Sequence, residues 1–396
     1  MILAINAGSS SIKFALFKVA GSSLDQVFTG EIENIGTNKA TLNFAYTIDQ
    51  QKNKVDLDAA THDQAANHLI TWLEKQEDFD SVTAIGHRLV HGMKHTEPEL
   101  ITADLLVELK KITAFDPEHL PVEIKLIETF GKRYPTLKQV ACFDTSFHAA
   151  MPVVAKLLTI PRRYYEMGIQ RYGFHGLSYA YLMQELERIE GKAAAKGKII
   201  LAHLGNGASL AAVKDGKSVD TSMGFTPTSG LPMGTRCGDL DPGVAWYLMQ
   251  HEHLTPEKFN HLINQESGLL GISETSSDMR ELMEIEDIDE RAREAIGVFC
   301  YQTKKWIGAF GAALGGVDLL VFTGGIGEHS PEVRSKICDG LEFLGIELDE
   351  IKNMSNEPVV STQTSSVKVR VINTNEELII AKIVCDILNY SIEGVS

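Results

Sequence analysis

The 396-residue sequence lacks several features that would assign it quickly to a class of protein. It has no run of about eighteen apolar residues, which excludes an ordinary transmembrane helix. It has no G-x-x-x-x-G-K-[ST] motif, so a P-loop is not its means of holding phosphate. Its five cysteines form no C-x-x-C pair and their number is odd. We therefore expect no disulfide framework and a reduced, cytoplasmic compartment.

Positive charge is also scarce. The chain carries 37 Lys and Arg against 53 Asp and Glu, a net charge of −16. This balance argues against a nucleic-acid or acidic-membrane partner. The first five residues read as a strand and contain no basic region with a cleavage site, so we expect no secretory signal. An acidic protein that binds an anion must place its few cations locally, which gives weight to each arginine in a glycine-rich setting.

The length suits two domains, and the chain shows a duplicated plan. Residues 2–6 and 12–19 alternate as strands around a Gly-Ser turn. Residues 198–204 and 210–213 repeat that arrangement around a second turn, and Asp215-Gly216 predicts a hairpin. Alternating strands and helices follow each opening, which indicates α/β layers. Residues 139–143 read as a buried strand that ends at Asp144, and residues 288–314 read as a long helix with small residues near 308–313.

Three glycine-rich turns follow strands far apart in the chain, at residues 6–11, 203–209 and 323–328. One such turn would mean little, but three suggest a cleft that holds a polyphosphate through backbone N–H groups. At the third turn, Ser330 and Pro331 predict an N-cap and the first turn of a helix. Taken alone, that third turn is better read as a plain strand-to-helix connection.

Nine motifs in order along the chain resemble those of acetate kinases and related short-chain acyl kinases, in the sugar kinase–Hsp70–actin superfamily. They are N-A-G-S-S-S-I-K (6–13), G-H-R-L-V-H-G (86–92), F-D-T-S-F-H (143–148), R-Y-G-F-H-G (171–176), H-L-G-N-G-A-S (203–209), D-T-S-M-G-F-T-P (220–227), G-T-R-C-G-D-L-D-P (234–242), F-T-G-G-I-G-E (322–328) and T-N-E-E (374–377). The resemblance covers essentially the whole chain.

The resemblance implies an α/β fold of two duplicated ribonuclease-H-like (actin-like ATPase) domains that face a nucleotide cleft. We expect an N-terminal acyl- and phosphate-binding domain at residues 1–146 and a nucleotide-binding domain at 147–375. The C-terminal segment, 376–396, should pack back on the first domain, with a helix from Glu376 to about Leu388. The resemblance also implies a homodimer.

The implied reaction is reversible transfer of the γ-phosphoryl group of ATP to acetate, which gives acetyl phosphate and ADP by direct in-line displacement. A carboxylate with a pKa of about 4 needs no general base, so catalysis rests on positioning and on charge neutralisation. The resemblance assigns Arg88 to the acyl carboxylate, Arg236 to the transferring phosphoryl group and His175 to its equatorial oxygens. Asp144 is expected to orient Arg88 or a metal-bound water. Without the resemblance, the arginines would be surface charges, His175 a core histidine and Asp144 a cap.

The resemblance also implies the residues around the substrates. Val90 and His119 help to wall the acyl pocket. The residues expected to bind ATP or ADP are Lys13, His203, Leu204, Gly205, Asn206, Gly207, Asp278, Met279, Arg280, Gly324, Gly325, Ile326, Gly327 and Glu328.

A magnesium (or manganese) ion would take oxygen ligands and keep several waters, so it needs few protein groups. Asn6 and one glutamate of residues 374–377 are the implied ligands. Thr374 and Glu377 have capping-box spacing, which would occupy Glu377 with the helix N-terminus. Glu376 is therefore the predicted metal ligand.

Several positions depart from the family pattern, namely Met93, Glu118, Tyr179, Ser229 and His329. Glu118 replaces an apolar residue near the acyl pocket, so the resemblance implies the reaction class but leaves the acyl substrate open. A propionate or butyrate kinase with the same mechanism is one alternative, and a non-catalytic ATP-binding module is another. His87 and His91 share a strand face about 13 Å apart, too far for one metal ion, so we interpret them and His95 as core or surface histidines.

Overall fold

The computed structural model describes residues 1–390 except 9, 22, 38 and 50. Ser9 of the first glycine turn and residues 391–396 of the predicted C-terminal segment therefore lie outside the described residues. The chain divides into two compact units. Unit 1 contains Met1–Ser146, Gly176–Tyr181 and the chain from Asn375, and unit 2 contains Phe147–His175 and Leu182–Thr374.

Unit 1 is built on an eight-stranded sheet with the order β5-β4-β3-β2-β1-β6-β8-β7. Its strands are β1 (Ile2–Ala7), β2 (Ile12–Ala20), β3 (Ser23–Glu33), β4 (Thr41–Tyr46), β5 (Lys52–Asp56), β6 (Ala84–Leu89), β7 (Glu99–Leu100) and β8 (Lys138–Phe143). Its helices are α1 (His62–Leu73), α2 (Ala103–Lys111), α3 (Leu120–Arg133) and α16 (Glu376–Leu388), with 3-10 turns at Phe79–Ser81 and Thr113–Phe115.

Unit 2 is built on a five-stranded sheet with the order β11-β10-β9-β12-β13. Its strands are β9 (Ile199–Leu204), β10 (Ala208–Lys214), β11 (Lys217–Thr221), β12 (Leu319–Thr323) and β13 (Lys368–Val371). Its helices are α4 (Val153–Lys156), α5 (Arg163–Glu166), α7 (Lys192–Ala195), α8 (Pro242–His251), α9 (Pro256–Gln265), α10 (Gly268–Ser273), α11 (Met279–Ile285), α12 (Glu290–Leu314), α13 (Gly324–His329), α14 (Pro331–Cys338) and α15 (Glu350–Met354). Helix α6 (Gly176–Glu190) starts in unit 1 and continues in unit 2.

The two sheets share one plan, so the predicted duplication is confirmed. In unit 1, β1 pairs antiparallel with β2 and parallel with β6, which pairs parallel with β8. In unit 2, β9 pairs antiparallel with β10 and parallel with β12, which pairs parallel with β13. The predicted hairpin joins β10 to β11, and Asp215 and Gly216 both adopt positive φ there.

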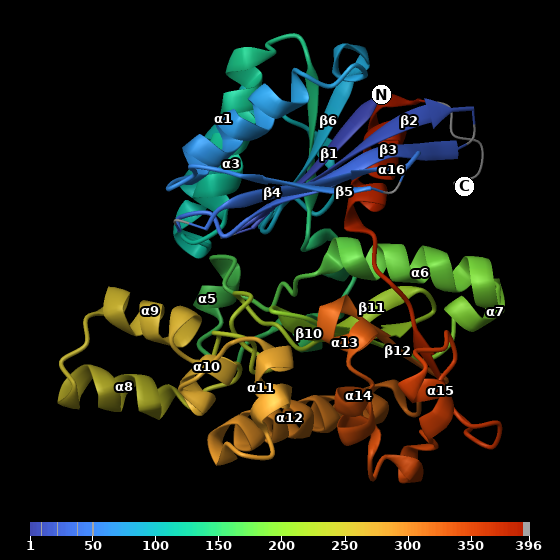
Figure 1. Cartoon of the computed structure of the whole chain (residues 1–396). Coiled ribbons are helices and arrows are strands. Elements are labelled where there is room, and N and C mark those ends of the chain that lie inside the picture. The colour runs from blue at the N-terminus through green and yellow to red at the C-terminus, as the bar shows by residue number, and fades with distance from the viewer. Residues whose placement is uncertain (9, 22, 38, 50, 391–396) are drawn as a thin grey trace. The chain divides into compact units, whose positions relative to one another are not determined.

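Alternating side chains of β1 bury both faces of the first sheet. Leu3 and Ile5 belong to the core that includes α1 and α3 residues, whereas Ile2 and Ala4 belong to the core that includes α16 residues. Helices on the two faces of that sheet are visible in Figure 1. Because strand side chains point alternately to opposite faces, this short apolar strand anchors both layers of unit 1.

The structure corrects two local predictions. The N-cap of α16 is Asn375, whose side chain accepts from Leu378 N, and not Thr374. The capping box proposed for Thr374 and Glu377 is therefore wrong. The third glycine turn is also not a simple bend, since residues 324–329 form the short helix α13 before α14 begins. Ser330 is the N-cap of α14, but its side chain makes no capping hydrogen bond.

All five cysteines have free thiols, four of them buried. Across the part of the chain that the structure describes, no helix is long and apolar enough to cross a bilayer.

Candidate active site

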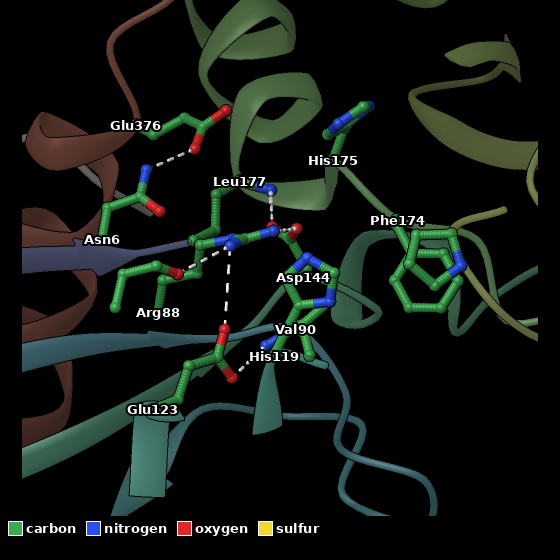
Figure 2. A network of polar contacts seen from close by, with 12 residues as sticks. Asn6, Arg88, Val90, His119, Glu123, Asp144, Phe174, His175, Leu177 and Glu376 are labelled. Atoms are coloured by element: carbon green, nitrogen blue, oxygen red, sulfur yellow. Dashed lines mark hydrogen bonds and ion pairs between the residues drawn. The ribbon is translucent and has the colours of Figure 1, made fainter. Parts of the chain in front are cut away.

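Arg88 lies near the end of β6, and carboxyl groups from two other elements contact it. Its Nη2 and Nε donate to Asp144 Oδ2 over 2.7 and 3.1 Å, and Nη1 lies 3.7 Å from Glu123 Oε1. Nη1 also donates to the carbonyl oxygen of Ala7 over 3.1 Å. We call Arg88, Glu123 and Asp144 the arginine cluster; Figure 2 shows its contacts. The contact between Asp144 and Arg88 fits the orienting role predicted for Asp144.

The arginine cluster is nearly closed to solvent, with side-chain exposures of 13% for Arg88 and 1% for both acids. Burial lowers the pKa of Arg88, but Asp144, Glu123 and Glu376 outweigh burial and raise it. Burial raises the pKa of Glu123 to about 8, against the opposing effect of Arg88. Arg88 is therefore held as a permanent cation between two carboxyls in a medium that disfavours ionised carboxylate.

Glu123 was not predicted from the sequence. It lies in the first turn of α3 and is buried among apolar residues of that helix. Its Oε2 accepts from the backbone N–H of Val90 over 2.9 Å, and its own N–H donates to the carbonyl of His119 over 3.1 Å. The signal available in the sequence was an acid among the apolar residues of 120–130, because a buried acid needs a partner.

Glu123 thus connects the two residues predicted to line the acyl pocket. The Val90 side chain is buried, and His119 is buried with its Nδ1 3.0 Å from Asp116 Oδ1. Asp116 also accepts from the His119 backbone N–H. The Val90 backbone and the His119 side chain are thus each held by a buried carboxyl group, Glu123 and Asp116 respectively.

Asn6 and Glu376 lie together in unit 1, as Figure 2 shows. Asn6 Nδ2 donates to Glu376 Oε2 over 2.7 Å and lies 3.4 Å from Glu377 Oε1. Burial raises the pKa of both glutamates; Asp144 adds to the shift at Glu376, and Glu376 adds to it at Glu377. Crowded carboxyls of this kind fit a divalent cation that prefers oxygen. The choice of Glu376 over Glu377 now rests on its shorter contact with Asn6.

Unit 2 holds a second set of predicted residues around the turn between β9 and β10. His175 Nδ1 lies 2.9 Å from Ser209 Oγ, and its ring stacks on His203 with centroids 4.2 Å apart. Gly207 lies beside His175 and Arg236. A Cβ at this glycine would be 3.3 Å from His175 Nε2 and 3.7 Å from Arg236 Nη1. His175, Arg236 and this turn therefore meet, and a side chain at position 207 would crowd the His175 ring.

The second and third glycine turns are also neighbours. Gly324 has a φ of +76°, and a Cβ there would lie 2.7 Å from the carbonyl oxygen of Leu204. A Cβ on Gly205 would lie 3.7 Å from Gly325 N. These two turns thus lie backbone against backbone, at the ends of the adjacent strands β9 and β12.

The segment with Asp278, Met279 and Arg280 approaches the same region of unit 2. A Cβ on Gly234 would lie 3.2 Å from Ser277 O and 2.1 Å from Asn206 Oδ1. Asp278 caps α11 by accepting from Arg280 N, Met279 is buried, and the Arg280 side chain is 82% exposed.

Three further residues predicted to bind the nucleotide are Glu328, Gly327 and Lys13. Glu328 Oε1 accepts from Thr323 Oγ1, Gly324 N and Thr374 N, so its carboxylate holds the third turn. Gly327 is buried within α13 beside Ile326. Lys13, in unit 1, lies 4.0 Å from Glu31 Oε1 and is 53% exposed.

The departures from the family pattern have distinct surroundings. Met93 adopts a φ of 52°, a conformation that favours glycine, and Tyr179 is fully buried. Glu118 is half-buried, and His329 is 70% exposed, 3.9 Å from Glu328 Oε2. Ser229 lies beside Gly224, where a Cβ would be 2.5 Å from its Oγ.

The three histidines of the 87–95 segment contact protein groups, but only His87 lies in a strand, because β6 ends at Leu89 and His91 does not share its face as predicted. His87 is buried with Nε2 2.7 Å from Gln139 Oε1, and burial lowers its pKa to about 4. His91 is buried and accepts from Met93 N, and His95 contacts Glu99 and Glu108.

The chain is similar to known proteins along its whole length. The model of the Acetokinase family matches residues 1–382. The acetate kinase of Thermoanaerobacterium thermosaccharolyticum is 43% identical over 96% of this chain and 97% of its own, and that of Methylocella silvestris is 41% identical over 96% of each.

Two solved structures agree with this assignment. The acetate kinase of Porphyromonas gingivalis has a TM-score of 0.85 at 37% identity and covers 98% of this chain and 99% of its own. A propionate kinase of Francisella tularensis has a TM-score of 0.89 at 37% identity and covers 96% of this chain and 98% of its own. With the duplicated fold and the family model in agreement, this chain belongs to the Acetokinase family.

Proposed function

We propose that the chain is an acetate kinase, which transfers the γ-phosphoryl group of ATP reversibly to acetate by direct in-line displacement and releases acetyl phosphate and ADP. The observation that carries this proposal is the family match over residues 1–382 together with the curated acetate kinases similar over 96% of the chain. The acceptor is already an anion, so the reaction needs positioned cations more than a base.

Unit 1 supplies the acyl site in this proposal. Arg88 binds the acetate carboxylate through its planar guanidinium, and Asp144 fixes the direction of that group through two hydrogen bonds to one oxygen. Val90 and His119 flank the acyl chain. Because Arg88 and Asp144 are buried and hydrogen-bonded to each other, little rearrangement of this pair is needed when the small substrate binds.

Unit 2 supplies the phosphoryl site. The turns at residues 203–207 and 324–327 approach the nucleotide phosphates, and Lys13, which belongs to unit 1, is a further cation. The segment with Asp278, Met279 and Arg280 flanks the nucleoside. Arg236 and His175 donate to the oxygens of the transferring group, where charge is greatest in the transition state.

Asn6 and Glu376 would hold a magnesium or manganese ion. When bound, that ion neutralises part of the charge of the ATP phosphates. The chain's own residues then align the acceptor oxygen with the γ-phosphorus and exclude water, which would hydrolyse the acyl phosphate.

Propionate or butyrate is the second candidate acceptor, because the similar structures include a propionate kinase. A hydrophobic pocket separates such substrates by only about 1–3 kcal/mol per methylene. The depth of the pocket beyond Val90 therefore decides the ranking of substrates and not the reaction class.

We also propose that the protein acts in the cytoplasm as a homodimer on small-molecule substrates. Five free thiols fit a reducing compartment. Helix α8 buries none of its residues, even though it is rich in apolar ones. Its aromatic residues Trp246 and Tyr247 are 67% and 54% exposed. An apolar helix of this kind is a candidate contact with a second copy.

Trapping the product tests the function directly. Purified protein with ATP and Mg²⁺ should convert acetate to acetyl phosphate, detected as the hydroxamate with hydroxylamine, while ADP forms in equal amount. Acetate, propionate and butyrate are compared in parallel, and an assay without carboxylate measures ATP hydrolysis alone. Nucleotide binding without acyl phosphate from any acid would favour a non-catalytic ATP-binding module.

A further inference from the structure

Glu123 is a buried carboxyl on the side of Arg88 that Asp144 does not occupy. Its side chain is 1% exposed, and Oε1 accepts no hydrogen bond from the described residues, although it lies 3.7 Å from Arg88 Nη1. Its other oxygen is held by Val90 N. A buried carboxylate oxygen with no hydrogen bond is costly to keep ionised.

We propose, on the basis of the acetate kinase function above, that Glu123 is a positioning residue and that the substrate carboxylate binds Arg88 together with a proton on Glu123. Two carboxyls already face one guanidinium. With both ionised, the arginine cluster carries a net charge of −1 and repels an incoming carboxylate. With Glu123 protonated, the cluster is neutral and Arg88 can accept the substrate as its second anionic partner.

The groups around Glu123, taken together with its burial, raise its pKa and so favour the protonated carboxyl. Burial is the largest cause that raises its pKa to about 8; Arg88 from β6 and Val90 N lower it, while Asp116 before α3 and Asp144 after β8 raise it. His119 and His91 act mainly on Asp116. A bound substrate anion beside Arg88 adds a further negative charge and raises the pKa of Glu123 again. The proton therefore stays on Glu123 in the complex, and acetate affinity falls as pH rises above 8.

The test is the pH dependence of KM for acetate at saturating MgATP, measured with the full chain. The wild type should show KM nearly constant from pH 6 to 7 and about tenfold higher at pH 9, as linkage to one proton requires. Glu123→Gln keeps an acceptor for Val90 N but cannot ionise, so its KM should stay within about twofold over the same range. Glu128→Gln, on the same helix α3, is the matched control and should retain the wild-type profile.

Calorimetry supplies a readout that does not depend on turnover or on the variants folding. Acetate titrated into wild-type protein at pH 8.5, in two buffers of different ionisation enthalpy, should take up between about half a proton and one proton per acetate bound. A Glu123→Gln variant that keeps the wild-type rise in KM, or acetate binding without proton uptake, would overturn the proposal. Failure to form acyl phosphate from any carboxylate would instead reject the function on which it rests.

Discussion

Arg88 and Arg236 are chemically identical but lie in different surroundings. Arg88 is held by two carboxyls in unit 1. Arg236, in unit 2, donates from Nη1 to neutral acceptors, the carbonyl oxygen of Pro227 and the sulfur of Met233. Two hydrogen bonds to Asp144 fix the direction of the Arg88 guanidinium, which suits the proposed binding of the acceptor carboxylate. We propose that Arg236 meets the charge of the phosphoryl group in flight.

For Arg88→Ala we expect a substantial increase in KM for acetate and a loss of stability. Removal of one partner from a buried ion pair costs about 3–5 kcal/mol, because the remaining acids are left without their cation. Steady-state kinetics and urea unfolding measure the two effects. Arg88→Lys, which keeps the charge but loses the planar fork, should recover most of the stability and less of the KM. An unchanged acetate KM in Arg88→Ala would show that Arg88 does not bind the acceptor.

For Arg236→Ala we expect kcat to fall by roughly 10³–10⁵, with a smaller change in either KM, as for other arginines that meet transition-state charge. Arg236→Lys should restore only part of kcat. Single-turnover measurements with saturating ATP and acetate separate chemistry from binding. A near-normal kcat for Arg236→Ala would remove this residue from the catalytic assignment.

At the scale of elements, the turn after β9 and the turn after β12 depend on close backbone approach. Gly324 has positive φ and faces the Leu204 backbone, and the Glu328 carboxylate ties the same turn to Thr374 N. The second and third glycine turns are therefore one structural piece, although about 120 residues separate them. A substitution in the third turn should therefore displace the backbone of the second turn.

Gly324→Ala should destabilise the protein by about 2 kcal/mol or more, because its φ is left-handed and the new Cβ meets a carbonyl oxygen. The KM for ATP should rise, while the KM for acetate, bound in unit 1, should change little. Gly308→Ala is the matched control, since a Cβ at that position in α12 meets nothing within 4 Å. It should stabilise the helix by roughly 0.5–1 kcal/mol. Chemical denaturation measures the free energy of unfolding of both variants. Equal stability of Gly324→Ala and the parent would contradict the prediction.

At the scale of the molecule, the proposed acyl site belongs to unit 1 and the phosphoryl site to unit 2. In-line transfer needs both at one phosphorus atom, so we expect the units to close when both substrates are bound. Small-angle scattering with a non-hydrolysable ATP analogue, Mg²⁺ and acetate should show a smaller radius of gyration than free protein. Ultracentrifugation at the same concentrations controls for a change in oligomeric state. Identical compactness with and without ligands would count against closure.

Much of the fold followed from local pattern. Alternating apolar residues located the strands on either side of the first two turns, and Asp215-Gly216 located a hairpin because both residues tolerate positive φ. The helix from Glu376 to Leu388 was predicted with its observed bounds. The buried strand that ends at Asp144 was also correct. Each of these depends on neighbours a few residues away, which a sequence displays directly.

Tertiary structure decided the features that depend on distant partners. Asn375 caps α16 instead of Thr374, and the Thr374 N–H donates to Glu328, which lies 46 residues earlier. Glu123 meets Arg88 only because α3 packs against β6 and buries its first turn. No local sequence pattern around Thr374 or Glu123 identifies the distant residue that each one contacts. The sequence by itself determined the layers, the duplicated turns and the family, whereas the charge state of the acyl site follows from which carboxyls the packed layers bury beside Arg88.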